Sequence, residues 1–289
     1  MQKKLLYQNK KIYYHTYGSG KPVILIHGFG EDSEIWNNQA EFLKDRFQLI
    51  IPDLPGSGKS EIIDDMSMEG MAEVIKCILD EEIQHNNLVL QEEKTELPDS
   101  KVPPCGGFRG AGACIIGHSM GGYITLAFAE KYQNHLTALG LFHSSAFADS
   151  EEKKATRRKG IDFINQHGAF EFLKTSTPNL FSPQTKDERP ELIDEQLAAV
   201  HNFLPAALVY YYEAMINRPD RTELLRKATV PVLFIMGKYD AAVPLEDGLK
   251  QCHLPEKSYI HILQKSGHMG MLEEADESNR ALNNFLMEL

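Results

Sequence analysis

The sequence predicts an α/β fold in which a mostly parallel central sheet of about eight strands is flanked by helices. Short runs of β-branched and aliphatic residues alternate with longer segments of helical periodicity, which is the pattern of a parallel sheet with crossover helices. Runs such as 23–26 and 230–236 are almost entirely apolar, as expected of strands that are buried on both faces. A chain of 289 residues is long enough for one large domain with an excursion, or for two domains.

The composition excludes several classes of function. A net charge of −11 argues against nucleic acid and anionic membranes as partners, because both require a basic footprint. The four cysteines show neither a C-x-x-C pair nor metal-ligand spacing, so we expect free thiols in a reducing compartment and no bound metal. The segment 1–11 lacks the apolar region of a signal peptide, and no run approaches the ~20 apolar residues of a transmembrane helix. We therefore expect a cytoplasmic protein, whose oligomeric state the sequence does not indicate.

The first third of the chain is predicted to form a hairpin, two buried strands and two helices. The expected strands are 5–7, 12–17, 23–26 and 47–51, and the expected helices are 33–44 and 67–83. The turn residues 8–10 join the first two strands into a hairpin at a sheet edge. Ser33 is the expected N-cap of the first helix.

The stretch 53–60 ends in Gly58-Lys59-Ser60, which invites comparison with a phosphate-binding loop. Such a loop requires a glycine five residues before Gly58, where this chain has Asp53, and a carboxylate there would repel phosphate. We therefore interpret the stretch as a turn-rich loop between a strand and a helix.

Between about residues 86 and 112 the alternating pattern breaks down. The segment is rich in proline, glycine and charge, and only 88–90 could form a strand. We interpret it as a loop-like insertion that is dispensable for chemistry.

The rest of the chain is predicted to complete the sheet around a helical block. Strands are expected at 113–116, 139–142, 230–236 and 259–263, with a helix after the first of them that runs to about 132 and another at the C-terminus. Helical patterns at 151–167, 170–173, 190–204 and 205–216 fall between the strands at 139–142 and 230–236. On this basis residues 1–144 and 226–289 form the core domain, and the aromatic-rich block 145–225 forms a helical lid, although aromatic residues at helical spacing are also common in cores.

Ser119 lies at the corner where the strand 113–116 gives way to a helix. Such a corner strains the backbone and is tolerated when the residues two before and two after are small, here Gly117 and Gly121. The strain exposes the hydroxyl, and the helix N-terminus favours the negative oxygen that forms when a nucleophile attacks a carbonyl group.

Asp240 and His268 also follow predicted strands. Active groups in parallel sheets gather at the carboxyl ends of the strands, and the chain order Ser119, Asp240, His268 is the order expected of a catalytic triad on such a sheet. The weaker rivals are Asp53, Asp149, His118, His143 and His261. The glycines around Phe29 allow the backbone to fold back with its N–H groups outward, as one half of an oxyanion hole.

With these features, the chain resembles the lid-bearing serine hydrolases of the α/β-hydrolase superfamily over nearly its whole length. The motifs that carry the resemblance are His27-Gly28-Phe29-Gly30, the loop 53–60, Gly117-His118-Ser119-Met120-Gly121-Gly122, Gly237-Lys238-Tyr239-Asp240 with Val243-Pro244, and Gly267-His268. One departure is Ala275, where the family often has proline after a glutamate of its last helix.

The resemblance implies a mechanism and a class of substrate. Ser119 would attack the carbonyl carbon of a small acyl substrate, His268 would take its proton and Asp240 would orient the imidazole, without a cofactor. The backbone amides of Phe29 and Met120 would form the oxyanion hole. Carbon–carbon bond hydrolases of ring-cleavage products carry the same three residue types, and a ligand-binding sensor with little turnover is a third alternative. The residues that contact the substrate cannot be assigned from the sequence.

Overall fold

Eight strands form a single sheet within the part of the chain that this computed structural model describes, residues 1–92 and 112–289, where only the backbone is described for residues 85–92. The strands are β1 (Gln2–Tyr7), β2 (Lys10–Tyr17), β3 (Pro22–Ile26), β4 (Gln48–Pro52), β5 (Ala113–His118), β6 (Leu136–Phe142), β7 (Val232–Gly237) and β8 (Ser258–Leu263). Their spatial order is β1-β2-β4-β3-β5-β6-β7-β8, which confirms the predicted fold class.

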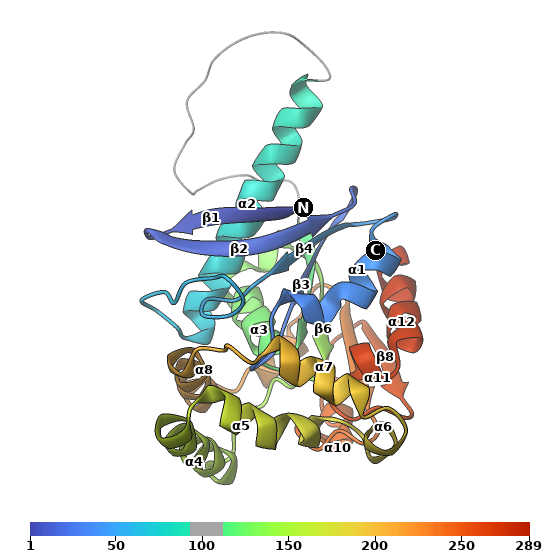
Figure 1. Cartoon of the computed structure of the whole chain (residues 1–289). Helices are drawn as coiled ribbons and strands as arrows, with labels where there is room; N and C mark the ends of the chain where they lie inside the picture. Colours follow the sequence, from blue (N-terminus) through green and yellow to red (C-terminus); the bar gives the residue numbers. More distant parts are fainter. Residues whose placement is uncertain (93–111) are drawn as a thin grey trace.

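The sheet is parallel from β4 to β8, and an antiparallel hairpin forms one edge. β1 pairs with β2, and β2 pairs with β4, in antiparallel register. The two residues between β1 and β2, Gln8 and Asn9, have φ values of 48° and 63°, the left-handed geometry of a tight hairpin turn. The predicted edge hairpin is therefore confirmed (Figure 1).

Helices cover both faces of the sheet and the edge at which the strands end (Figure 1). Those that pack on the sheet or close the chain are α1 (Asn37–Leu43), α2 (Met68–Glu92), α3 (Met120–Tyr132), α9 (Thr222–Arg226), α10 (Leu245–Leu249), α11 (Gly270–Glu273) and α12 (Ala275–Met287). Those between β6 and α9 are α4 (Glu151–His167), α5 (Ala169–Ser176), α6 (Pro183–Glu188), α7 (Glu191–Ala199) and α8 (Pro205–Asn217). Short 3₁₀ helices are η1 (Ser33–Trp36), η2 (Gln133–His135) and η3 (Thr177–Leu180).

Alternate residues of the buried strands belong to two separate hydrophobic clusters. Ile24 and Ile26 of β3 lie in a cluster with apolar residues of α2 and α3. Val23 and Leu25 lie in a second cluster with residues of α1 and α12. Because successive side chains of a strand point to opposite faces, each central strand supplies both layers, as its continuous apolar sequence predicts.

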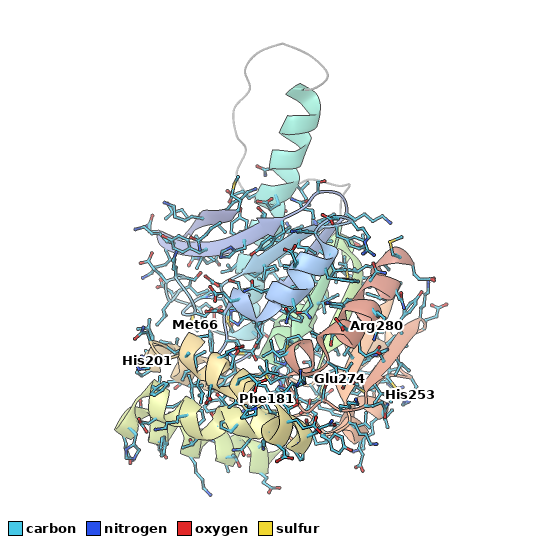
Figure 2. All side chains as sticks on the ribbon, turned by 45° about the vertical axis from the view of Figure 1, so that its right-hand side comes forward. Met66, Phe181, His201, His253, Glu274 and Arg280 are labelled. Atoms are coloured by element: carbon cyan, nitrogen blue, oxygen red, sulfur yellow. The ribbon has the colours of Figure 1, made fainter. Side chains whose placement is uncertain are left out.

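The segment α4–α8 lies over the end of the sheet at which β5, β6, β7 and β8 terminate (Figure 1). Phe181, after η3, is 2% exposed and belongs to the same hydrophobic cluster as β3, α1 and α12, so this segment shares the core (Figure 2). On α4 the buried residues are Gly160 and Ile164, whereas Phe163 is 36% exposed. The short helices α6, α9 and α10 were not predicted from the sequence.

Three local predictions need correction. The N-cap of η1 is Asp32, whose carboxylate accepts from the Glu34 amide, and not Ser33. α2 continues to Glu92 instead of ending near Ile83, so 88–90 is helical and the proposed insertion begins later than predicted. The remainder of that insertion, 93–111, lies outside the described residues. In the described part of the chain, no helix combines the length and apolarity that a membrane span requires.

Candidate active site

Ser119 occupies a strained corner between β5 and α3. Its φ of 51° and ψ of −116° lie in a backbone region that residues other than glycine rarely adopt. A Cβ atom on Gly117 would lie 2.1 Å from the carbonyl carbon of Gly121, and one on Gly121 would lie 2.5 Å from the carbonyl oxygen of Ile26. The two glycines are therefore required by contact, as the sequence predicted.

The end of β6 holds this corner in place. The amide of Ser119 donates to the Phe142 carbonyl at 2.9 Å, and the Ser144 hydroxyl donates to the Ser119 carbonyl at 2.7 Å. The Gly122 amide also donates to the Ser119 carbonyl, at 3.0 Å. Hydrogen bonds on both sides of Ser119 thus stabilise its unfavourable backbone conformation.

Asp240 and His268 are brought together from the ends of β7 and β8, which are adjacent parallel strands. Nδ1 of His268 lies 2.8 Å from Oδ2 of Asp240, while Oδ1 accepts from the amides of Ala242 and Val243 at 2.9 and 2.8 Å. Burial opposes ionisation of Asp240, but the charge of His268 and hydrogen bonds from His143 and His268 outweigh it, so the pKa of this carboxyl lies well below its usual range. With Nδ1 donating to a carboxylate, neutral His268 leaves Nε2 free to accept a proton.

Ser119 and His268 line the same cavity, which has a volume of about 810 Å³. Phe29 lines it beside them, and the helical segment contributes Arg157, Leu173 and Tyr212 to its walls. The rings of Phe29 and Tyr212 stack with centroids 4.3 Å apart, so the loop after β3 contacts α8 directly. Within the described residues the Ser119 hydroxyl makes no hydrogen bond, including none to His268, and apo sites often have such loose geometry.

The two amides expected to form the oxyanion hole belong to Met120, which directly follows Ser119, and to Phe29, which lies in the loop after β3 and lines the same cavity as Ser119. Met120 is the first residue of α3, so its amide has no acceptor within the helix. Phe29 lies between Gly28, whose amide donates to Glu31 Oε2 at 2.7 Å, and Gly30, whose φ is +67°. Gly30 therefore supplies the positive φ at which the loop after β3 turns.

Glu31 and His118, the residue before Ser119, form a buried ion pair. Nδ1 of His118 lies 2.9 Å from Oε2 of Glu31, and Nε2 lies 2.9 Å from the carbonyl oxygen of His268. Since both neighbours are acceptors, His118 carries two protons. Burial disfavours the charged form of His118, but the charge and hydrogen bond of Glu31 prevail and raise its pKa; the pKa of Glu31 is lowered by His118 in turn, against its burial.

The loop that contains His268 is fixed by Glu273. Its Oε1 accepts from the amides of Gly267 and Met269 at 2.8 and 3.1 Å. Its Oε2 accepts from the Ser182 amide at 2.8 Å and from the Thr185 hydroxyl at 2.7 Å, both at the start of α6. The amide of His268 itself donates to the Leu180 carbonyl at 2.6 Å. The loop of His268 is therefore attached to the helical segment.

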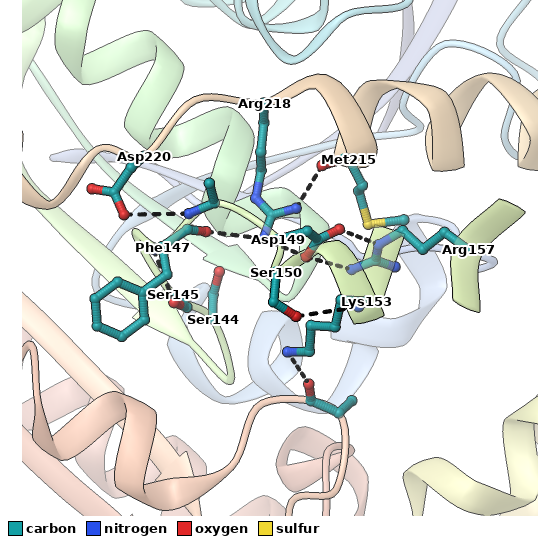
Figure 3. Close-up of polar contacts among 12 residues, drawn as sticks. Ser144, Ser145, Phe147, Asp149, Ser150, Lys153, Arg157, Met215, Arg218 and Asp220 are labelled. Atoms are coloured by element: carbon teal, nitrogen blue, oxygen red, sulfur yellow. Dashed lines mark hydrogen bonds and ion pairs between the residues drawn. The ribbon is translucent and has the colours of Figure 1, made fainter. Parts of the chain in front are cut away.

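The rival acids have other partners. Asp149, after β6, pairs with Arg157 Nε at 2.5 Å and with Arg218 at 2.9 Å (Figure 3). The guanidinium of Arg218 also lies 3.8 Å from the centroid of the Tyr123 ring. These contacts join α4 and the end of α8 to the core. Asp53 accepts from the Ser33 amide at 3.1 Å. Neither acid is bound to a histidine in the part of the chain that the structure describes.

The rival histidines divide into surface and buried groups. His261 lies on the surface, 4.0 Å from Glu277. His118 and His143 are buried beside His268, with ring centroids 4.9 and 5.6 Å from it. The roles of His143 and Glu31 were not predicted, although both directly follow segments that were recognised as strand ends or glycine loops.

One group of possible metal ligands occurs among the described residues. It consists of His143, Asp240 and His268, whose ligand atoms lie within 4.8 Å of one another. The same nitrogen and oxygen atoms form the hydrogen bonds described above, at 2.8 and 3.0 Å. The hydrogen bonds alone therefore account for the arrangement.

A parallel sheet with a serine on the corner after β5, and an Asp–His pair after β7 and β8, defines a hydrolase of the α/β class. The chain belongs to the alpha/beta hydrolase family, whose model matches residues 23–281. It is 25% identical over 292 residues to a 2-hydroxy-6-oxo-6-phenylhexa-2,4-dienoate hydrolase of Comamonas testosteroni, covering 96% of this chain and 91% of that one.

Other relatives are esterases. A pimeloyl-[acyl-carrier protein] methyl ester esterase of Legionella pneumophila (strain Corby) is 24% identical over 274 residues, which is 92% of this chain and 95% of the relative. The structure of a thermophilic esterase from Thermogutta terrifontis superposes with a TM-score of 0.84 at 28% identity, covering 100% of this chain and 98% of that one. The relatives thus include both hydrolases of carbon–carbon bonds and esterases.

Proposed function

We propose that the protein is a serine hydrolase that cleaves a small ester by way of an acyl-enzyme. The observation that carries the proposal is the placement of Ser119, on its strained corner, in one cavity with His268, whose Nδ1 is bound to Asp240. A serine on a strained corner that shares a cavity with an oriented imidazole is the arrangement that nucleophilic catalysis requires. The family and the esterases among the relatives support the same reaction.

In the proposed reaction Ser119 Oγ attacks the ester carbonyl while His268 Nε2 takes its proton. The negative oxygen of the tetrahedral intermediate is held by the amides of Phe29 and Met120. His268 then returns the proton to the leaving alcohol as the acyl–oxygen bond breaks. Water attacks the acyl-enzyme in the same way, its proton passing through His268 to Ser119 Oγ, and releases the carboxylic acid.

We further propose that residues 1–144 and 226–289 act as the catalytic core and 145–225 as a lid. The segment α4–α8 supplies part of the wall of the cavity that Ser119 lines, including Leu173 and Tyr212. A lid in this position would select the acyl and alcohol groups that reach the serine. The sheet on which the lid lies is not required to select these groups.

A second candidate is the hydrolysis of a carbon–carbon bond next to a ketone. It is favoured by the relatives named as hydrolases of 2-hydroxy-6-oxo-dienoates, one of which matches over 96% of this chain. The same three residues would serve, but the leaving group would be a carbon, which must be protonated as the bond breaks.

Labelling and turnover together test these candidates. We expect a fluorophosphonate to add once to the wild-type protein, on Ser119, and not to Ser119→Ala. Labelling of Ser144 or Ser145 instead would contradict the assignment of the nucleophile. Hydrolysis of p-nitrophenyl acetate and butyrate, compared with cleavage of a 2-hydroxy-6-oxo-dienoate, then separates esterase from carbon–carbon hydrolase. Labelling without turnover of either substrate would favour a ligand-binding sensor.

A further inference from the structure

His143 donates to the same carboxylate oxygen as His268. It directly follows β6, and its Nδ1 lies 3.0 Å from Oδ2 of Asp240, compared with 2.8 Å for Nδ1 of His268. Because a carboxylate only accepts hydrogen bonds, Nδ1 of His143 must carry a proton. The Asp240 carboxylate thus has four donors, two on each oxygen.

Three parts of the fold fix the position of the His143 ring or leave space for it. Its backbone has a φ of 49°, and its amide donates to the Ile235 carbonyl at 2.8 Å. A Cβ atom on Gly237 would lie 2.7 Å from His143 Cε1, and one on Gly270 would lie 2.4 Å from Nε2. The ends of β6 and β7 and the start of α11 therefore all make room for an imidazole at this place.

The placement of His143 lowers the stability of the fold, so stability does not explain it. His143 is 1% exposed, and its Nε2 is buried without a hydrogen-bond partner in residues 1–92 and 112–289. A buried polar atom without a partner and a left-handed backbone on a residue with a side chain both cost free energy. Burial outweighs the hydrogen bond that His143 donates to Asp240 and lowers the pKa of His143, so the ring is a neutral donor.

We propose that His143 is a positioning residue that fixes the Asp240 carboxylate and limits how strongly it attracts the proton on His268. This inference rests on the proposed function. Two imidazoles sharing one oxygen prevent the carboxylate from rotating, and the second donor spreads its negative charge. Without His143, Oδ2 would face only His268 and would stabilise the imidazolium form more strongly. The base would then keep its proton to a higher pH.

Three titratable groups face the His143 ring, and together they decide how its removal changes the pH profile. They are Asp240 after β7, His268 after β8, and His118 at the end of β5, whose own partner is Glu31. His118 keeps its charge through Glu31, so removal of His143 changes the donors on Asp240 and leaves the other pair in place. The effect should appear on the acid side of the pH profile.

The test compares a variant that removes the donor with one that keeps it. His143→Ala lacks the donor, whereas His143→Asn tolerates a positive φ and offers an amide N–H near the position of Nδ1. We expect His143→Ala to move the acid limb of kcat/KM up by on the order of one pH unit. We also expect kcat to fall about tenfold or more, as when a hydrogen bond to a charged group is lost, with KM little changed. His143→Asn should restore most of both, and His253→Asn, at an exposed histidine, is the matched control.

A purely structural role would give a different result. If His143→Ala lowers Tm but leaves kcat and the acid limb unchanged, the proposal is wrong. The rate of fluorophosphonate labelling of Ser119, measured as a function of pH, gives the acid limb of the pH profile without an ester substrate. The result therefore does not depend on which ester is chosen for the assay. If Ser119 of the wild type is not labelled at all, the proposed function itself has failed.

A measurement on the wild type does not depend on the folding of any variant. Imidazole ¹⁵N chemical shifts should show His143 as the neutral Nδ1–H tautomer from pH 5 to 8. A neutral Nε2–H tautomer would overturn the proposal, because Nδ1 could not then donate to Asp240.

Discussion

Glu31 and His118 lie 87 positions apart in the sequence and form a buried pair, with 2.9 Å between Oε2 and Nδ1. The pair contacts three loops of the site at once, because Glu31 accepts from the Gly28 amide and His118 donates to the carbonyl of His268. His118 also directly precedes Ser119. One ion pair thereby connects the loop of Phe29, the corner at Ser119 and the loop of His268.

The first prediction concerns this pair. Glu31→Gln should lower the free energy of unfolding by about 3 to 5 kcal/mol, because it leaves a buried imidazolium without its counter-ion. The measurement is urea unfolding near pH 5.5. A loss no larger than that of Glu34→Gln, a neighbouring and exposed carboxylate, would contradict the prediction.

The pH dependence of this loss has a defined sign. The pKa of His118 is raised, so its contribution is complete below the ordinary value of 6.5 and is lost as pH rises through the folded pKa. The pKa of Glu31 is lowered, so its contribution is complete above 4.5 and is lost as pH falls through the folded pKa. The difference between wild type and Glu31→Gln should therefore be largest between pH 4.5 and 6.5 and decrease toward alkaline pH.

The second prediction concerns the base and the acid. His268→Ala should reduce turnover on the order of 10⁴- to 10⁶-fold, and Asp240→Asn on the order of 10⁴-fold, because the imidazole loses its orientation. Stopped assays on p-nitrophenyl butyrate, with His253→Ala as the control, provide the comparison. Residual activity within tenfold of the wild type in either variant would remove that residue from the triad.

The third prediction concerns the corner at Ser119. Gly117→Ala places a Cβ atom 2.1 Å from backbone atoms of Gly121, so we expect little folded protein, or a loss of more than about 3 kcal/mol. Gly168→Ala is the informative comparison, because its φ is +87° but nothing lies within 4 Å of the added atom. It should cost only about 1 kcal/mol, from backbone strain alone. Equal losses in thermal melts of the two variants would show that contact at Gly117 is unimportant.

The fourth prediction concerns the contact between the helical segment and the core. Asp149→Asn leaves Arg157 and Arg218 without their carboxylate, and we expect a loss of about 3 kcal/mol, since both arginine side chains are largely buried. Glu151→Gln, whose exposed carboxylate pairs with Lys154, should melt as the wild type does. Differential scanning calorimetry distinguishes the two, and identical melting temperatures would count against the role of Asp149.

Much of this fold could be predicted because its signals are local. Apolar runs of strand length identified the strands of the sheet. The glycines two residues before and two residues after Ser119 indicated a tight corner from the sequence alone. Asp240 and His268 could be paired because each lies in the loop that follows a strand, and parallel strands end at one edge.

What could not be predicted depends on contacts between distant segments. Glu31 and His143 follow recognised segments, but their partners are fixed only by the packing of the loops. Asp32 and Ser33 are both good capping residues, and Asp32 acts as the cap while the Ser33 amide donates to Asp53 across the fold. The end of α2 was predicted near Ile83 because the apolar periodicity is lost there, but α2 continues to Glu92. Loss of apolar periodicity does not by itself end a helix.

Glu273 has a consequence for how a substrate could enter. Because its two oxygens bind the loop of His268 on one side and the start of α6 on the other, these two segments form a single mechanical unit. An outward displacement of α6 would pull the loop of His268 with it and, under the proposed function, would displace the base at the moment of opening. The segments that move to admit a substrate are therefore expected among α4, α5 and α8, while α6 stays attached to the core.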